Sequence, residues 1–356
     1  MKAKPAMKRF LVLFLTLLLV GCSTAPNSLH STQSGLDLTD DPDNCGAEGY
    51  ACANGRSCVS SLCTPAWQDI SDGGIGVGYA QGATLDGKFL VVGGFSDTGS
   101  GNSLTTTQVY DPSGDTWTTV SDLNSARGQF TASFGPEGVF AYGGLGNVYE
   151  GGSDVPGVEV LFDLAEGWVS VPIDQTNVPY GVASTWTGTS FFTYGGAGSE
   201  TVGGLLTLGD LWNPTTCSHD FCGINGKYTM FFDKKVVHVF GGNSPTTNGL
   251  LFDVPTSTWY NWGLPSDTPD FSSVITNQPK FGDDGQRIFY LGNAPSVLIY
   301  DRETESWGED LATQPTGLCD EAAASWVGSE LFAWGGICGG VISSVGGRYQ
   351  PPAPGL

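Results

Sequence analysis

The sequence predicts an all-β fold built from repeated short strands. Fifty-three glycines among 356 residues, and a charged fraction of only 14%, favour short strands and tight turns over charged amphipathic helices. Ten tryptophans and twelve tyrosines supply the large side chains that strands accommodate well. A run of apolar residues that ends in two glycines also recurs along the chain, which indicates a structural repeat.

The repeat has a period of about 50 residues. Its glycine pairs are Gly93-Gly94, Gly143-Gly144, Gly195-Gly196, Gly241-Gly242 and Gly335-Gly336, with a weaker copy at Gly292-Asn293. Successive copies are 50, 52, 46, 51 and 43 residues apart. In most copies an aromatic and a polar residue then precede a tryptophan: Tyr110-Asp111 with Trp117, Phe162-Asp163 with Trp168, Phe252-Asp253 with Trp259, and Tyr300-Asp301 with Trp307.

This pattern resembles the kelch repeat, in which each copy forms one four-stranded blade of a β-propeller. The resemblance covers residues 67 to about 352 and implies a six-bladed kelch-like propeller over residues 64–356. The sixth copy has Tyr349 but no tryptophan, whereas Trp67 precedes the first copy without a glycine pair. We therefore expect an N-terminal strand around Trp67 to complete the sixth blade and close the ring.

The repeat also explains the lone histidine in the run "VHVFGG". His238 occupies the position that Leu90, Phe140, Phe192, Phe289 and Phe332 hold in the other copies. We therefore expect His238 to be a hydrogen-bonded core residue rather than a ligand or a catalyst. Asp283-Asp284 lies in a predicted hairpin turn, and no alternating acidic loop surrounds it, so a turn is favoured over a calcium site.

The first residues have the features of an export signal. Four basic residues within 2–9 precede an apolar run over 10–20, which is shorter than the roughly 20 residues that span a bilayer. Leu19-Val20-Gly21-Cys22 resembles the lipobox of bacterial lipoproteins, which implies a signal peptide over 1–21 and lipidation (palmitate included) of Cys22. In that family Ser23 implies the outer membrane or surface of a Gram-negative cell. The polar segment 22–44 is expected to be a disordered tether.

The other eight cysteines are expected to form disulfides, because their number is even and the chain is predicted to be exported. Residues 45–63 form a Cys-rich module with Cys45, Cys52, Cys58 and Cys63, for which three pairings are open. Their spacing does not match zinc ligands. The module resembles one that precedes repeat domains in myxobacterial exported proteins, although Glu48 and Ser61 depart from its pattern. Cys217 with Cys222, and Cys319 with Cys338, are expected to close locally.

The sequence lacks the usual catalytic motifs. It has no GxSxG, HExxH, CxxC or phosphate-binding loop, so we expect no metal and no cofactor. Galactose oxidase, a kelch-type copper enzyme, needs two histidine ligands, whereas this chain has only His30, His219 and His238. Sialic acid mutarotase, another six-bladed kelch-like enzyme, needs no metal, and acid and base groups on loops leave little trace in a sequence.

Propeller ligands usually bind on one face around the central channel. The loops that enter the first strand of each blade would present Tyr79, Arg127, Tyr180, Asn225, Asp320 and Glu321 there. Arg127 best matches the kelch arginine, and its two possible roles, in a ligand site or in ordering its own loop, remain open. The polar loops 95–107 and 145–157 are candidate contact surfaces.

Three functions follow as hypotheses. The first is a membrane-anchored, exported propeller that binds a protein or a glycan and catalyses nothing. The second is a metal-independent carbohydrate-active enzyme resembling sialic acid mutarotase, and the third is a structural protein of the cell envelope. The net charge of −22 argues against nucleic acid as a partner and leaves the lipid anchor as the predicted contact with a membrane.

Overall fold

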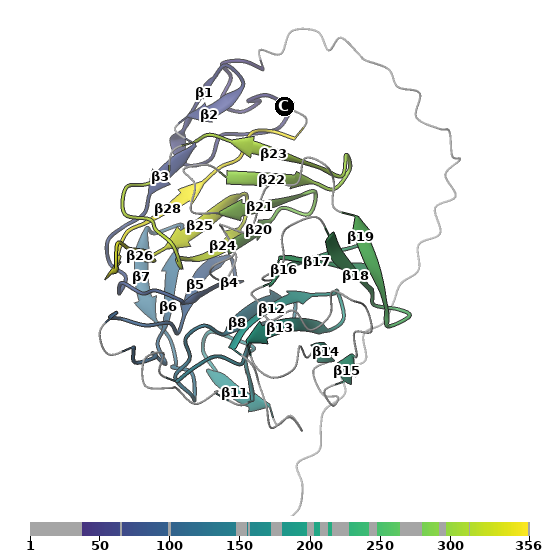
Figure 1. Ribbon diagram of the computed structural model, residues 1–356. Coiled ribbons are helices and arrows are strands. Elements are labelled where there is room, and N and C mark those ends of the chain that lie inside the picture. Colours follow the sequence, from purple (N-terminus) through teal and green to yellow (C-terminus); the bar gives the residue numbers. More distant parts are fainter. Residues whose placement is uncertain are drawn as a thin grey trace, which may run out of the picture. The chain divides into compact units, whose positions relative to one another are not determined.

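A computed structural model of the chain has six four-stranded antiparallel sheets, as the sequence predicts (Figure 1). The structure describes residues 38–64, 66–98, 101–146, 155, 157–171, 180–197, 203–206, 213–215, 228–241, 248–263, 280–291, 297–312 and 314–354. None of the helices among these residues is long and apolar enough to cross a bilayer.

The sheets are blades 1 to 6 in chain order. Blade 1 contains β4 (Gln81–Leu85), β5 (Lys88–Val92), β6 (Thr107–Asp111) and β7 (Thr116–Thr119). Blade 2 contains β8 (Thr131–Gly135), β9 (Gly138–Tyr142), β10 (Val158–Leu161) and β11 (Trp168–Val171). Blade 3 contains β12 (Tyr180–Trp186), β13 (Phe191–Ala197), β14 (Gly203–Leu206) and β15 (Asn213–Thr215). Blades 4 and 5 are β16 (Tyr228–Asp233), β17 (Val236–Gly241), β18 (Asn248–Asp253) and β19 (Thr258–Gly263); and β20 (Lys280–Asp283), β21 (Arg287–Leu291), β22 (Val297–Asp301) and β23 (Ser306–Asp310). Blade 6 combines β24 (Ala323–Val327), β25 (Glu330–Trp334) and β28 (Gly346–Tyr349) with β3 (Trp67–Asp69) from the other end of the chain.

The first strand of each blade faces the centre of the ring (Figure 1). These inner strands contact one another in the order β4, β8, β12 and β16, and β24 contacts both β20 and β4. Strands then follow one another outwards within each blade, in chain order for blades 1 to 5. A small hairpin, β26 (Ile337–Cys338) with β27 (Val341–Ile342), branches from blade 6.

Aromatic side chains fill the wedges between blades. Tyr110 of blade 1 packs against Phe332 of blade 6 with ring centroids 5.8 Å apart, and Phe192 of blade 3 stacks on Phe252 of blade 4 at 4.7 Å. All four rings are buried. The repeated aromatic positions therefore form the interfaces between the sheets, because a flat ring buries a large apolar area in a narrow space.

The glycine pairs lie where strand two ends and two backbones approach closely. Gly335 and Gly336 have φ angles of 80° and 104°, which disfavour other residues. A Cβ atom on Gly336 would lie 2.5 Å from the carbonyl oxygen of Cys319, inside van der Waals contact. The pair is thus a backbone requirement of blade 6, and the glycine pairs of blades 1 to 3 have positive φ angles as well.

The ring closes as predicted. β3 pairs antiparallel with β28, with Trp67 opposite Tyr349 and Asp69 opposite Gly347. The rings of Trp67 and Tyr349 lie 5.3 Å apart, and both side chains are buried. The last blade therefore takes its outer strand from the start of the propeller, which leaves β28 without an open edge.

Two disulfides hold the Cys-rich module, and they join Cys45 to Cys58 and Cys52 to Cys63. This settles which of the three pairings forms. The module contains a one-turn 3-10 helix η1 (Ala53–Gly55) and the hairpin β1 (Ser57–Val59) with β2 (Leu62–Thr64).

Residues 38–44, assigned to the tether from the sequence, belong structurally to the module. The amides of Gly46 and Ser61 donate to the carbonyls of Leu38 and Thr39, and the amide of Cys52 donates to Pro42. These backbone bonds leave no sign in the composition of the segment. The Cys319–Cys338 disulfide forms as expected, whereas Cys22, Cys217 and Cys222 lie outside the described residues.

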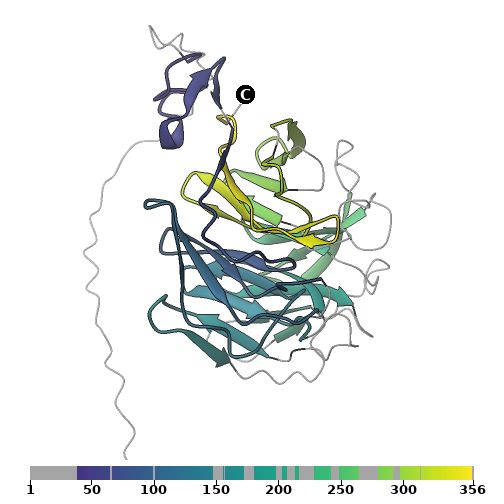
Figure 2. The same cartoon turned by 90° about the vertical axis from the view of Figure 1, so that its left-hand side faces the viewer.

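The module is fastened to blade 6 and to the C-terminal segment (Figure 2). The guanidinium of Arg56 lies 2.5 Å from the carboxylate of Glu330 at the start of β25, and both side chains are buried. The Tyr50 hydroxyl donates to the Pro351 carbonyl at 2.6 Å, and the Gln350 side chain bonds the backbone of Ala51 and Ala53. The module thus holds the strand that closes the ring.

We predict that Arg56→Ala destabilises the protein far more than the matched change Lys88→Ala. Loss of Arg56 leaves the Glu330 carboxylate buried without its cation, which should cost about 3–5 kcal/mol of the free energy of unfolding. The Lys88–Asp111 pair, at 3.0 Å, is about one-third exposed, so its loss should cost less than about 1 kcal/mol. Chemical denaturation of both variants measures the difference, and equal losses would contradict a fastening role for Arg56.

Candidate functional site

A cavity of about 450 Å³ lies at the centre of the ring, where the inner strands face one another. Residues from the first strand of every blade line it. Hydroxyl, amide, carboxylate and aromatic groups are all present along it: Gln81, Thr131, Ser133, Phe134, Ser184, Thr185, Trp186, Phe231, Asp283, Ser325 and Trp326. This size and this mixture of apolar and polar groups are typical of a small-molecule site.

The cavity reaches the end of the channel at which strand one turns into strand two, which we call the turn end. Phe134, Trp186 and Trp326 are the last or next-to-last residues of their strands, and Gly285 follows β20 in its turn. The opposite end, where loops enter strand one, is the loop end. The sequence pointed to the loop end, whereas the described cavity reaches the turn end.

One repeat position supplies most of the distinctive side chains at the turn end. It stands nine residues before the first glycine of each pair, or before Gly292 in blade 5, and it holds Thr84, Phe134, Trp186, Phe232, Asp283 and Trp326. Four of these six residues line the cavity. The signal that identified His238 as a strand position, alignment on the glycines, could also have found this set.

The aromatic side chains at this position are held by neighbouring strands. A Cβ atom on Gly135 would lie 2.6 Å from the ring of Trp186, so the indole packs directly on that glycine. Trp326 packs in the same way on Gly282 and stacks on Phe289 at 4.9 Å. Phe134 is 37% exposed, a high value for so large a ring. The turn end thus presents fixed apolar faces.

The hydroxyl groups along the cavity differ in their hydrogen bonds. Thr131 and Ser184 bond each other at 2.7 Å, and Ser325 bonds Thr84 at 2.9 Å. The Oγ atom of Ser133 is buried, with the residue 8% exposed, and forms no hydrogen bond with any described residue. A buried hydroxyl without a partner is destabilising, and the burial of this Oγ atom closes it to a ligand in the present rotamer.

Asp283 is the one ionisable group in the described lining. Both of its carboxylate oxygens accept hydrogen bonds from Arg302, at 2.7 and 2.6 Å. Arg302 also donates to the carbonyl of Phe232 and lies 5.9 Å over the Phe231 ring. The pair therefore ties blade 5 to blade 4. Asp283 and Asp284 also cap their turn, as expected, by accepting from the amides of Gly285 and Gln286.

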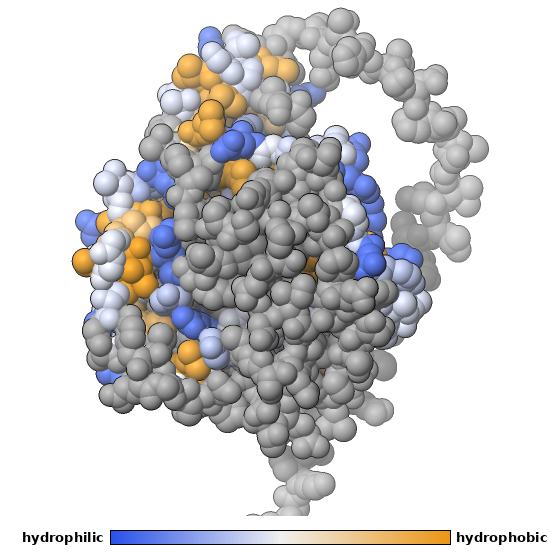
Figure 3. Space-filling model, in the orientation of Figure 1, coloured by the Kyte–Doolittle hydropathy of each residue, from blue (hydrophilic) through white to orange (hydrophobic). Residues whose placement is uncertain are grey.

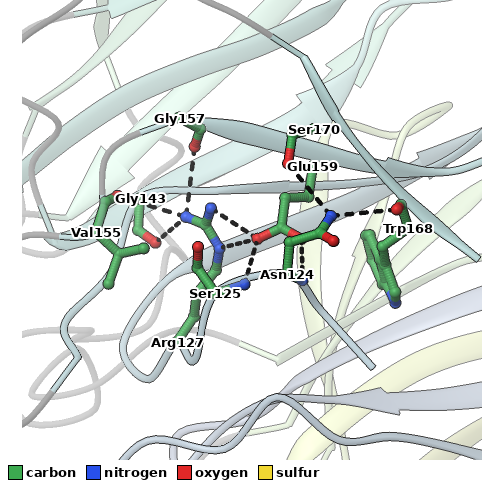
Figure 4. Close-up of polar contacts among 9 residues, drawn as sticks. All are labelled: Asn124, Ser125, Arg127, Gly143, Val155, Gly157, Glu159, Trp168 and Ser170. Atoms are coloured by element: carbon green, nitrogen blue, oxygen red, sulfur yellow. Dashed lines mark hydrogen bonds and ion pairs between the residues drawn. The ribbon is translucent and has the colours of Figure 1, made fainter. Parts of the chain in front are cut away.

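Arg127 does not line the described cavity. Figure 4 shows its side chain among its hydrogen-bond acceptors. Its side chain is 1% exposed and bonds the Glu159 carboxylate at 3.0 Å, and its Nη1 donates to the carbonyl of Gly143 at 2.8 Å. Glu159 also accepts from the amides of Asn124 and Ser125. Burial lowers the pKa of Arg127, against the opposing effect of Glu159. Of its two possible roles, the structure supports ordering of its loop.

The remaining predicted site residues lie at the loop end. Tyr79 has a φ of 55°, and its amide donates to the carbonyl of Glu321, which joins blades 1 and 6 there. Tyr180 begins β12, and Asp320 bridges Ile337. None of these four residues lines the described cavity, and Asn225 lies outside the described residues.

His238 is a packing residue of blade 4. Its ring stacks on Phe231 at 4.5 Å and meets the edge of Trp262 at 4.6 Å. Contrary to the expected hydrogen-bonded arrangement, its Nδ1 is buried without a bond to any described residue. Burial lowers the pKa of His238 to about 4, although Asp233 opposes the shift and Arg302 adds to it. His238 is therefore neutral at pH 7.

The other surfaces of the protein have fewer features of a binding site than the cavity has. The predicted contact loops touch each other, because the amide and hydroxyl of Ser103 donate to Gly146 and Leu145. Apolar side chains gather on the module and beside β26 (Figure 3), where Val59 and Val341 are 50% and 67% exposed. Roughly half or more of a typical protein surface is apolar, so exposed apolar groups of this kind are common. The cavity is thus the better candidate.

The comparisons with known proteins agree with the fold. Residues 78–124 match the family model of the Kelch motif. The solved structure of YjhT superposes with a TM-score of 0.60 at 11% sequence identity, over 80% of this chain and 98% of that chain. A search of curated proteins finds no match. At this identity the likeness shows the propeller fold alone.

We predict that His238→Phe removes part of the acid sensitivity of the fold. The unfolded chain protonates His238 near its ordinary pKa of 6.5, whereas the folded chain does so near 4. Stability is therefore lost as the pH falls through this window, by roughly 2–3 kcal/mol between pH 7 and pH 4. Denaturation at both pH values should show a smaller loss for the variant, and an unchanged loss would contradict the buried neutral state.

Proposed function

We propose that this protein is a binding propeller whose central cavity holds a small glycan without chemical turnover. The observation that carries the proposal is the lining of the turn end, where Phe134, Trp186 and Trp326 lie along a cavity that is also lined by hydroxyl and amide side chains such as Thr185 and Gln81. Saccharides combine apolar C–H faces with many hydroxyls, so they match both kinds of group.

The lining favours binding over catalysis. General acid–base catalysis of a sugar needs at least one group free to accept or donate a proton. Among the described lining residues the only such candidate is Asp283, and both of its oxygens are engaged by Arg302. A carbohydrate-active enzyme of the sialic acid mutarotase kind therefore finds less support than a binding module. The third hypothesis, a purely structural protein, would need no such cavity.

We further propose that the propeller is exported and attached to a membrane through lipid on Cys22, at the outer membrane or cell surface of a Gram-negative bacterium. The basic residues, short apolar run and lipobox-like Leu19-Val20-Gly21-Cys22 support this. The disulfides of the module are consistent with export to an oxidising compartment.

Binding should depend on the aromatic residues of the turn end. We expect Phe134→Ala and Trp326→Ala each to weaken glycan binding about tenfold, or roughly 1.4 kcal/mol, through loss of stacking area. Tyr180→Phe, at the loop end of β12, is the matched control and should bind as the parent does. Titration calorimetry against a saccharide panel measures this, with melting curves to verify folding. A loss confined to Tyr180→Phe would place the ligand at the loop end instead.

The anchor is testable separately. In a Gram-negative host that processes lipoproteins, Cys22→Ser should abolish incorporation of labelled palmitate and move the protein from the membrane to the soluble fraction. Ser23→Ala, beside it, should remain labelled. If the Cys22→Ser protein is still labelled and stays in the membrane fraction, the proposed attachment is wrong.

A further inference from the structure

We infer that the cavity selects uncharged saccharides and rejects sugars that carry a carboxylate. This inference rests on the proposed function and specifies its ligand class. Three features of the protein support it: the charge that lines the turn end, the partners of the nearby arginines and the net charge of the chain.

The described lining has one formal charge, and it is negative. Asp283 is 46% exposed at its side chain, so a ligand at the turn end meets its carboxylate. Arg302 lies behind it with its side chain only 10% exposed. Its guanidinium donates to Asp283 and to the Phe232 carbonyl, so these donors already have acceptors. A bound anion would face Asp283 rather than Arg302.

The other described buried arginines are also committed to structural acceptors. Each lies beside its own carboxylate and outside the cavity lining: Arg56 with Glu330, Arg127 with Glu159, and Arg287 with Asp284. Recognition of a carboxylate usually uses a guanidinium fork or a set of converging amides. The described part of the cavity has no such fork, so a sugar carboxylate would lose water without gaining a cation.

The groups that are present suit a neutral ring. The aromatic rings that line the cavity, among them Phe134 and Trp186, can contact the C–H side of a pyranose, and the hydroxyl and amide side chains along it can bond ring hydroxyls. The net charge of −22 adds a long-range field that disfavours anions. Local and long-range electrostatics therefore act in the same direction.

The test compares matched neutral and anionic sugars on the full-length protein, kept in a detergent without a sugar headgroup. The pairs are glucose with glucuronate and galactose with galacturonate, and N-acetylneuraminate and neutral disaccharides complete the panel. We expect the neutral member of a pair to bind at least tenfold more tightly. The preference should persist at about 0.5 M salt, because a local contact is screened less than the field of the whole surface.

Asp283→Asn identifies the source of the preference. The amide keeps an oxygen that can cap the turn at Gly285, removes the negative charge and leaves the Arg302 cation with only its more distant carboxylate, Asp233 at 3.9 Å. We expect anionic sugars to gain about tenfold relative to neutral ones. Asp86→Asn makes the same change of charge in an exposed turn of blade 1 and should leave the ratio unchanged.

The outcomes separate this inference from the proposed function. Equal or tighter binding of the anionic sugars by the parent protein overturns the inference and leaves glycan binding intact. A preference that disappears at high salt, or that responds equally to both Asp variants, overturns its assignment to Asp283. Failure of the parent protein to bind any member of the panel overturns the proposed function and the inference with it.

Discussion

The pairing of β3 with β28 is the constraint on which the remaining structure depends. Each inner strand is positioned by the blades on its two sides, so the cavity keeps its lining only while the ring is closed. Closure buries Trp67 and Tyr349 and covers the outer edge of β28. Arg56 and Glu330 secure the same blade from the side of the module, and the site therefore depends on contacts far from it.

Some repeat positions keep nearly the same residue type from blade to blade, whereas the position at the turn end varies. The glycine pairs and wedge aromatics recur because every blade meets the same backbone and packing requirements. The repeat position nine residues before the glycines is present in every blade, but its residue type varies, with Thr84, Trp186 and Asp283 as examples. Because four of its six side chains line a shared cavity rather than equivalent interfaces, these four blades contribute different chemistry to one site.

The sequence was sufficient for the fold and insufficient for the site. The period of the glycines predicted the number of blades. Trp67, a tryptophan that no glycine pair precedes, predicted the strand that closes the ring. The pairing of Cys45 with Cys58 could not be predicted from the sequence, because the local spacing of the four cysteines permits three arrangements. Arg127 matched a familiar motif, yet only the position of Glu159 shows that its charge is compensated. The sequence does not distinguish Phe134 from a core residue, because an exposed aromatic of a strand has the same residue type and spacing as a buried one.

The attachment of the module also determines how the protein would transmit mechanical load. A pull on the chain before residue 38 reaches the disulfide-linked module first, and then the Arg56–Glu330 contact and β3. Covalent links resist extension within the module, and the β3–β28 ladder lies directly after it in the chain. In a propeller held at its N-terminal side, the disulfide-linked module therefore lies between the point where force is applied and the β3–β28 pair that closes the ring.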